Sequence, residues 1–207
     1  SSFQLQDLKH SPKIAIILDV FPDHLDAHQN LKEYLEAKSN IVKNQRRSDL
    51  VFYFSGNKQS KSIALKSNGK KIAVAPDKNI TDLKIPGEHN RKNAAMVMAV
   101  ANELKVPQKR VIQVLKKFSG LTHRLQLVKT IKGVKFYNDA ASTNPETTAA
   151  AIMSFPNQPK IIIMGGKDKN LDYEPVAEAA YGEDVKLVIL FGENRRKIEK
   201  ALRGTAK

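Results

Sequence analysis

The chain has 207 residues, no cysteine and a formal net charge of +14. The length suits one large or two modest globular domains. The lack of cysteine excludes disulfides, zinc-thiolate sites and thiol nucleophiles, which fits a reducing cytoplasm. No apolar run reaches transmembrane length, and the segment Ser1–Lys13 lacks the basic-then-apolar order of a signal peptide. We therefore expect a soluble cytoplasmic protein without membrane insertion.

The positive charge invites a nucleic-acid-binding interpretation, because clustered Lys and Arg give affinity for phosphates of any sequence. The basic residues are instead scattered through every segment, and the aromatic residues lie mostly in apolar runs rather than alternating with Arg. We therefore predict no nucleic-acid partner. A non-catalytic module that holds another anionic polymer on its basic surface stays open as an alternative.

Short runs rich in Ile and Val alternate with segments of helical period, which predicts an α/β protein with a largely parallel sheet. In the first half of the chain, strands are predicted at residues 13–20 and 50–54, and helices at residues 31–44, 90–105 and 108–118. Residues 62–75 are predicted to form a small meander of two further strands around the Asn68-Gly69 turn.

The pattern changes near Gly120, where we place a domain boundary that gives domains of residues 1–119 and 120–207. In the second domain, strands are predicted at residues 126–131, 134–138, 160–164 and 185–191, and helices at residues 144–153, 173–181 and 195–202. This order predicts a doubly wound arrangement, whose ligands usually lie beyond the carboxyl ends of the strands.

Three polar loops follow predicted strands, at residues 19–28, 138–144 and 165–172. In the first loop, His24 and His28 are four residues apart, as in helical zinc sites, but no third ligand is evident and an exposed helix start also explains the pattern. The third loop has two glycines and two lysines, a composition suited to an anion. The pattern G-x-x-x-x-G-K-[ST] is absent from the chain, so the sequence predicts no complete triphosphate site.

Seven strings along nearly the whole chain resemble the Mur ligase family in order and spacing. They are SSFQL from Ser1, PDHLDAH from Pro22, YLEAK from Tyr34, PGEHNRKN from Pro86, GLTHR from Gly120, NDAASTNPETT from Asn138 and GGKDKNLDY from Gly165. The resemblance implies the remainder of a P-loop-type central domain followed by a Rossmann-like C-terminal domain. The NDxxxTNP form is most similar to the D-glutamate-adding branch of the family.

The resemblance also implies an activity. The family uses ATP and Mg²⁺ to activate a carboxylate as an acyl phosphate, which an incoming amino group then attacks, and this chemistry needs cations and close alignment of the reacting groups. For the D-glutamate-adding branch, the amino acid is joined to UDP-N-acetylmuramoyl-L-alanine during peptidoglycan precursor synthesis. The partners implied are therefore a UDP-sugar peptide and an amino acid, and the full-length protein is expected to be a monomer.

Two metal-supporting residues follow from the same resemblance. His24 matches a histidine that helps to hold a second magnesium ion, although magnesium prefers oxygen ligands. Lys38 matches a lysine that carbon dioxide converts to an anionic carbamate. Without the resemblance, His24 is a helix-start histidine and Lys38 is a solvated surface lysine.

Five further residues match substrate-contacting positions of the family. Asn93, Arg124 and Asp139 match residues that contact the nucleotide, the last two from the C-terminal domain, so that the site is complete only on domain closure. Thr143 and Lys169 match residues that hold the carboxylates of D-glutamate, for which a hydroxyl and an ammonium are suitable. Thr143 also has an alternative interpretation as the N-cap of the following helix.

Two departures from the family pattern weaken this assignment. Ala141 stands where the D-glutamate-adding branch commonly has a lysine, which keeps open another Mur-like ligase, such as a folylpolyglutamate synthase relative or a cell-wall amidating enzyme. The chain also begins inside a motif and contains neither the UDP-binding domain nor the P-loop. We therefore expect a fragment that is inactive alone.

Overall fold

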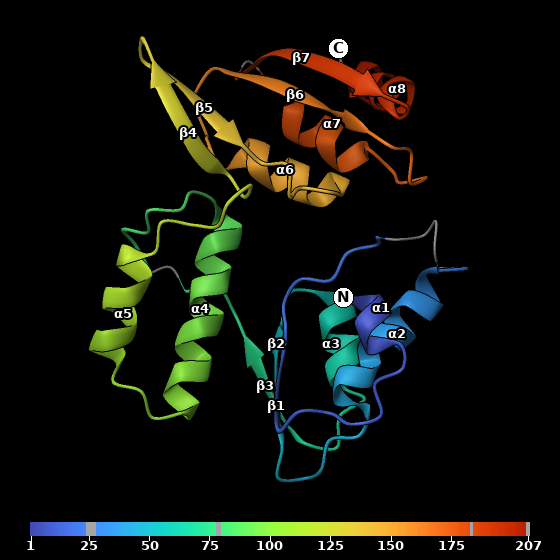
Figure 1. The fold of residues 1–207 in the computed structure, drawn as a ribbon, viewed down its shortest axis with the longest axis vertical. Helices are drawn as coiled ribbons and strands as arrows, with labels where there is room; N and C mark the ends of the chain where they lie inside the picture. Colours follow the sequence, from blue (N-terminus) through green and yellow to red (C-terminus); the bar gives the residue numbers. More distant parts are fainter. Residues whose placement is uncertain (24–27, 78–79, 183, 206–207) are drawn as a thin grey trace. The chain divides into compact units, whose positions relative to one another are not determined.

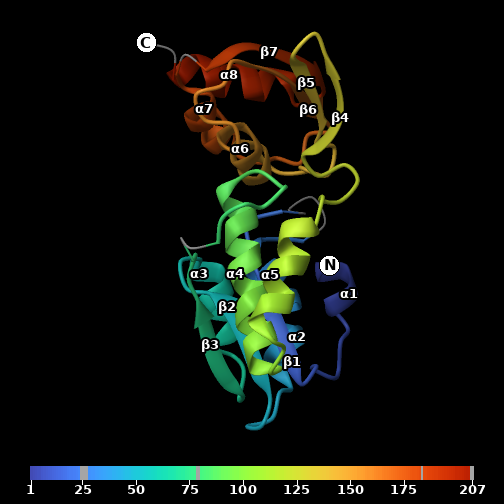
Figure 2. The same cartoon turned by 90° about the vertical axis from the view of Figure 1, so that its left-hand side faces the viewer.

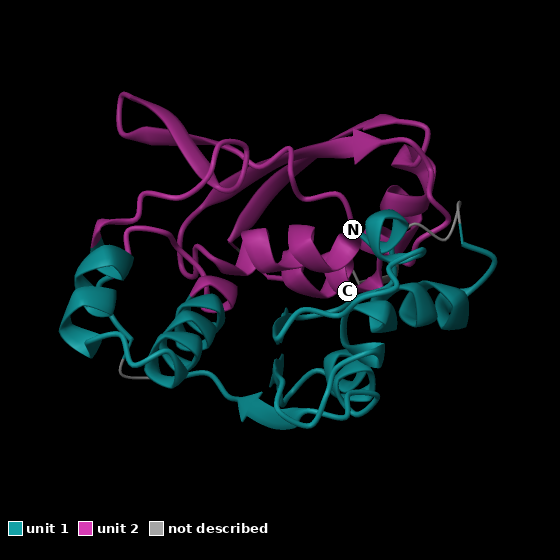
Figure 3. Ribbon diagram, turned by 60° about the horizontal axis from the view of Figure 1, so that its bottom comes forward, with its two compact units in different colours: residues 1–82, 91–116 teal, residues 83–90, 117–207 magenta. Residues whose placement is uncertain are grey.

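The computed structural model describes residues 1–23, 28–77, 80–182 and 184–205. These fold as two compact units, shown in different colours in Figure 3. Unit 1 consists of residues 1–82 and 91–116, and unit 2 consists of residues 83–90 and 117–207. Both units combine helices with parallel strands, so the predicted α/β class is confirmed. Among the described residues, no helix is long and apolar enough to cross a membrane.

Unit 1 is built on a parallel sheet of order β1-β2-β3 (Figure 1). Its strands are β1 (Ile14–Ile17), β2 (Leu50–Phe54) and β3 (Lys70–Val74). The helices of this part of the chain are α1 (Ser2–Leu5), α2 (Leu31–Lys43), α3 (Lys58–Ala64), α4 (Glu88–Glu103) and α5 (Gln108–Lys117). Apart from the first residues of α4, all of these helices lie almost entirely in unit 1.

The central strand β2 is buried on both faces. Val51 belongs to a cluster with buried residues of β1, α2 and α3, whereas Phe52 and Phe54 belong to a second cluster with Ala95 and Met96 of α4. Figures 1 and 2 show the same division, with α2 and α3 on one side of the sheet and α4 on the other. Because successive side chains of a strand point to opposite faces, the continuous apolar run of β2 suits a strand covered on both sides.

The predicted meander at residues 62–75 is wrong in its first half. This segment begins inside helix α3, and only β3 is a strand. The Asn57 side chain accepts a hydrogen bond from the Ser60 backbone N–H at 2.8 Å and so caps the start of α3. Ile63 and Ala64 are buried in the core, and β3 pairs in parallel with β2 rather than with a hairpin neighbour.

Unit 2 contains an antiparallel hairpin and a parallel pair of strands. The hairpin joins β4 (Gln126–Ile131) to β5 (Val134–Asn138), and the parallel pair consists of β6 (Lys160–Gly166) and β7 (Val185–Gly192). Three helices follow strands of this unit: α6 (Pro145–Met153), α7 (Glu174–Ala180) and α8 (Arg195–Thr205). These boundaries lie close to those predicted for the second domain.

One face of the β6-β7 pair carries the core of unit 2. Ile152 of α6, Val176 of α7 and Ile198 of α8 form a buried cluster against Ile162 and Leu190 of the strands. The alternate side chains of the two strands are between 45% and 69% exposed: Ile161, Ile163, Leu187, Ile189 and Phe191. The helices therefore cover one face of this strand pair and leave the other face exposed.

Candidate functional site

In unit 2, the turn at residues 123–125 is hydrogen-bonded to the loop that follows β5. The Asp139 carboxylate accepts hydrogen bonds from the Leu125 backbone N–H at 2.9 Å and from the Ser142 hydroxyl at 2.5 Å. Leu125 has a φ of 41°, a conformation that is costly for a residue with a side chain and that these contacts must hold. Arg124, which precedes Leu125, is exposed. The structure therefore brings the backbone at Arg124 next to Asp139.

The loop that follows β6 reaches the same loop after β5. The Lys169 ammonium donates a hydrogen bond to the Thr143 carbonyl oxygen, with the two atoms 3.4 Å apart. Thr143 is exposed, and the cap of α6 is its neighbour Asn144, whose side-chain oxygen accepts from the Thr147 N–H at 2.9 Å. The alternative interpretation of Thr143 as the helix N-cap is therefore wrong, because Asn144 has that role.

The first glycine of the loop after β6 has a structural explanation. A Cβ at Gly165 would lie 2.0 Å from the carbonyl oxygen of Phe191 in the neighbouring strand. The next residue, Gly166, donates its N–H to the Asn194 side-chain oxygen at 2.8 Å. The close approach of β6 to β7 requires a glycine at position 165, so Gly165 does not by itself indicate an anion site.

In unit 1, Lys38 lies half-buried on α2, and its ammonium is 4.7 Å from the centre of the Tyr34 ring. Burial lowers the pKa of the Lys38 amine from its ordinary value of 10.5, and this effect exceeds the opposing influence of the Asp23 carboxylate. Asp23 is itself buried. Lys38 is therefore not in the environment of a solvated surface lysine.

The second histidine of the first loop has a packing role. The His28 Nε2 atom lies 3.0 Å from the Ser2 hydroxyl oxygen, and the ring stacks on Phe3 and meets Tyr34 edge-on. His24 lies outside the described residues. Among the residues that the structure does describe, no group of three His, Cys, Asp or Glu side chains is placed to hold a metal ion.

Sequence reasoning missed Asn57, which fixes the start of the first loop. Its side chain contacts both the N–H and the carbonyl oxygen of Val20 at 3.3 Å, and it is buried. Its position before a helical segment was an N-cap signal that could have identified it.

The position of Asn93 on α4 is described by a contact of its neighbour Lys92. Asp19 forms an ion pair with Lys92 at 3.7 Å, and Lys92 precedes the half-buried Asn93. Asn93 is therefore adjacent in the sequence to a residue that contacts the loop after β1.

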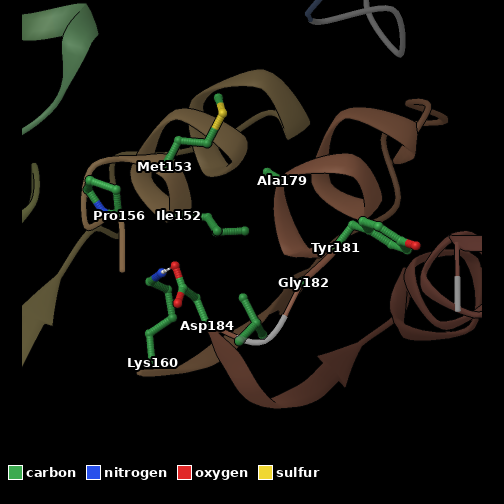
Figure 4. A pocket seen from close by; sticks show the side chains of 9 residues that line it. Ile152, Met153, Pro156, Lys160, Ala179, Tyr181, Gly182 and Asp184 are labelled. Atoms are coloured by element: carbon green, nitrogen blue, oxygen red, sulfur yellow. Dashed lines mark ion pairs between the residues drawn. The ribbon is translucent and has the colours of Figure 1, made fainter. Parts of the chain in front are cut away.

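Unit 2 also has a pocket of about 430 Å³, and none of the candidate residues described above lines it (Figure 4). Its walls include Lys160 and Val185, which begin β6 and β7, and the Lys160–Asp184 ion pair of 3.6 Å. Ligands of open α/β sheets usually bind at the opposite, carboxyl ends of the strands. The candidate site of unit 2 is therefore the group of loops after β5 and β6. The environment of Lys38 is a separate candidate in unit 1.

Comparison with protein families agrees with these two units. Residues 1–75 match the Mur ligase middle domain, and residues 123–207 match the Mur ligase, glutamate ligase domain. The two matched ranges together cover most of the chain. The chain belongs to the Mur ligase family.

Individual relatives carry a more specific name. A UDP-N-acetylmuramoylalanine--D-glutamate ligase of Natranaerobius thermophilus is 36% identical over an alignment that covers 98% of this chain and 49% of the relative. The chain thus spans about half the length of the curated relatives it matches. MurF from Acinetobacter baumannii has a TM-score of 0.74 at 17% identity, covering 93% of this chain and 49% of that chain. MurF ligase from Thermotoga maritima, solved in complex with ADP, has a TM-score of 0.63 at 16% identity, covering 95% and 64%. The structural matches show a shared fold.

Proposed function

We propose that the full-length protein containing this chain is an ATP-dependent ligase that adds D-glutamate to UDP-N-acetylmuramoyl-L-alanine in peptidoglycan precursor synthesis. The observation that carries this proposal is the position of the Lys169 ammonium 3.4 Å from the Thr143 backbone, at the ends of β5 and β6. A cation beside a residue that carries a hydroxyl suits the binding of an amino acid with two carboxylates. The name of the relative at 36% identity supports the same substrate.

Unit 2 supplies groups for the amino acid and the nucleotide in this proposal. Thr143 donates its hydroxyl hydrogen to a carboxylate of D-glutamate, and Lys169 gives that carboxylate a positive neighbour. Arg124 presents five N–H donors to phosphate oxygens. Asp139 accepts from a ribose hydroxyl with lone pairs that its bonds to Leu125 and Ser142 leave available, because a carboxylate has about four acceptor sites.

Unit 1 supplies Lys38 as the acceptor of carbon dioxide. Carbamate formation requires the neutral amine, and a lowered pKa enlarges the neutral fraction near neutral pH. In this step the amine nitrogen forms a bond to the carbon of carbon dioxide and loses a proton. The product is an anion near Asp23, and two neighbouring anions favour a bound cation. The Lys38 ammonium cannot be a magnesium ligand, but carbamate oxygens have the chemistry that Mg²⁺ prefers.

The remaining residues complete the proposed assignment. His24 is proposed to assist Lys38 at magnesium, and Asn93 is proposed to contact the nucleotide through an amide that both donates and accepts. ATP supplies the phosphoryl group that activates the acceptor carboxylate, and the chain's own cations neutralise the crowded oxygens. We further propose a domain division between residues 119 and 120, a cytoplasmic location and a monomeric full-length protein.

The test is ATP-dependent phosphate release by the full-length gene product, scanned over amino acids with UDP-N-acetylmuramoyl-L-alanine and other UDP-sugar peptides as acceptors. One observation favours a second candidate: Ala141 leaves the site without a second cationic contact to the amino acid. Another Mur-like ligase would then release phosphate with a neutral or basic amino acid, or with a different acceptor, rather than with D-glutamate.

A further inference from the structure

The loop that presents Lys169 also carries a carboxylate, because its sequence is Lys167-Asp168-Lys169. A carboxylate at this place opposes the binding of an anionic amino acid in two ways. It repels the incoming carboxylates, and it competes with them for the ammonium of an adjacent lysine. The loop therefore needs a partner for Asp168 if Lys169 is to serve an anionic substrate.

Lys197 of α8 is that partner. Its ammonium lies 2.6 Å from the Asp168 carboxylate and also donates to the Asn170 side-chain oxygen at 3.1 Å. Asp168 in turn accepts the Asn170 backbone N–H at 2.8 Å. The hydrogen bond from Lys197, as the largest influence, and this backbone hydrogen bond hold the pKa of Asp168 below its ordinary value of 3.8.

The position of Lys197 has no explanation within its own helix. It lies in the first turn of α8, where the N-terminal end of the helix dipole disfavours a cation. The segment before it is tied to the same loop, since Asn194 accepts from the Gly166 N–H at 2.8 Å and Glu193 accepts from the Asp168 N–H at 3.3 Å. The start of α8 is thus built against the loop that carries Lys169.

We propose that Lys197 is a positioning residue for amino-acid binding: it pairs with Asp168, so that this carboxylate does not compete with the substrate for the Lys169 ammonium. This inference rests on the proposed function of Lys169. It assigns no contact between Lys197 and the substrate. It follows that the weaker amino-acid binding on removal of Lys197 is caused by Asp168. A second substitution at Asp168 should therefore restore the binding.

The first test measures kcat and KM for D-glutamate in the full-length protein. Lys197→Met should raise KM by on the order of fivefold with little change in kcat, as expected from an exposed ion pair. Lys197→Arg should stay close to the wild-type protein. Asp168→Asn combined with Lys197→Met should return KM to near the wild-type value. Lys200→Met removes an exposed lysine of the same helix and should leave KM unchanged. A normal KM in Lys197→Met, or a double variant as impaired as the single one, would overturn the proposal.

The second test does not depend on turnover. In the full-length protein, the rate at which acetic anhydride acetylates Lys169 is followed by peptide mass spectrometry. Lys197→Met should slow this reaction several-fold, because the released Asp168 stabilises the Lys169 ammonium, and the added Asp168→Asn substitution should restore the rate. If D-glutamate gives no turnover but the labelling changes as described, the proposed function fails and the pairing role stands. Equal labelling of Lys169 in the wild-type protein and in Lys197→Met contradicts the inference in either case.

Discussion

The Lys169 ammonium lies 3.4 Å from the carbonyl oxygen of Thr143, a residue 26 positions away in the sequence. The contact joins the loop after β6 to the loop after β5. In the sequence, Lys167 and Lys169 have the same chemistry, and composition cannot choose between them. The position of Lys169 beside Thr143 distinguishes the two.

Lys169→Met should therefore impair amino-acid binding more than Lys167→Met. The loss of a charge-assisted hydrogen bond costs roughly 1.5–3 kcal/mol, so KM for D-glutamate should rise on the order of tenfold or more in Lys169→Met. Lys167→Met is the matched control, because it removes the same charge two residues away. Equal increases of KM in the two variants would show that general electrostatic attraction, rather than one positioned ammonium, holds the substrate.

Lys38→Ala should abolish turnover of the full-length protein, because only the lysine amine can become a carbamate. Added bicarbonate should not restore activity, whereas a short carboxylate such as acetate should restore part of it by occupying the same place. Lys43→Ala, at an exposed position of the same helix, should retain activity. Turnover of Lys38→Ala near the wild-type rate would show that no carbamate is needed.

The lowered pKa of Lys38 also predicts a pH dependence of stability. Between its folded pKa and the ordinary value of 10.5, the unfolded chain binds more protons at this residue than the folded chain. The free energy of unfolding should therefore rise with pH through this interval relative to Lys38→Met, which cannot titrate. Urea unfolding of both proteins from neutral pH towards pH 10.5 measures the difference. A difference that falls as the pH rises would contradict the burial of the amine.

Ala141→Lys should strengthen the binding of D-glutamate, because it adds the cation that this chain lacks. KM should fall on the order of tenfold or more if the new ammonium reaches a carboxylate. Lys167 could already bind the same carboxylate of D-glutamate, and this would hide the decrease of KM in Ala141→Lys. KM is therefore compared among Ala141→Lys, Lys167→Ala and the double variant. No change in any of the three, together with better turnover of a neutral or basic amino acid, would remove the D-glutamate assignment.

The sequence predicted most of the fold because local periodicity determines most elements. The hairpin of β4 and β5 was predicted with its observed boundaries, since alternation and the Lys132-Gly133 turn are both local signals. Helix α3 was missed because the N-cap signal at Asn57 was overlooked and the Asn68-Gly69 turn was interpreted as joining two strands. The parallel pairing of β3 with β2 is a long-range contact that no local pattern contains.

The candidate site was predictable in its residue types but not in its contacts. A motif can mark Lys38, yet its burial and the nearby Asp23 depend on how α2 packs against the sheet. The contact of Asp139 was not predictable either, because its carboxylate accepts a hydrogen bond from the Leu125 N–H, 14 positions away in the sequence. The contacts of Asn57 to Val20 were not predictable for the same reason, because they join segments that are distant in the sequence.

The central claim is tested most directly by phosphate release from ATP in the full-length gene product, with UDP-N-acetylmuramoyl-L-alanine as the acceptor. The account predicts release that requires both the acceptor and D-glutamate, and that is much weaker with L-glutamate or a neutral amino acid. The variant Lys169→Met should need more D-glutamate to reach the same rate. Release that proceeds equally without D-glutamate, or that prefers another amino acid, would contradict the account.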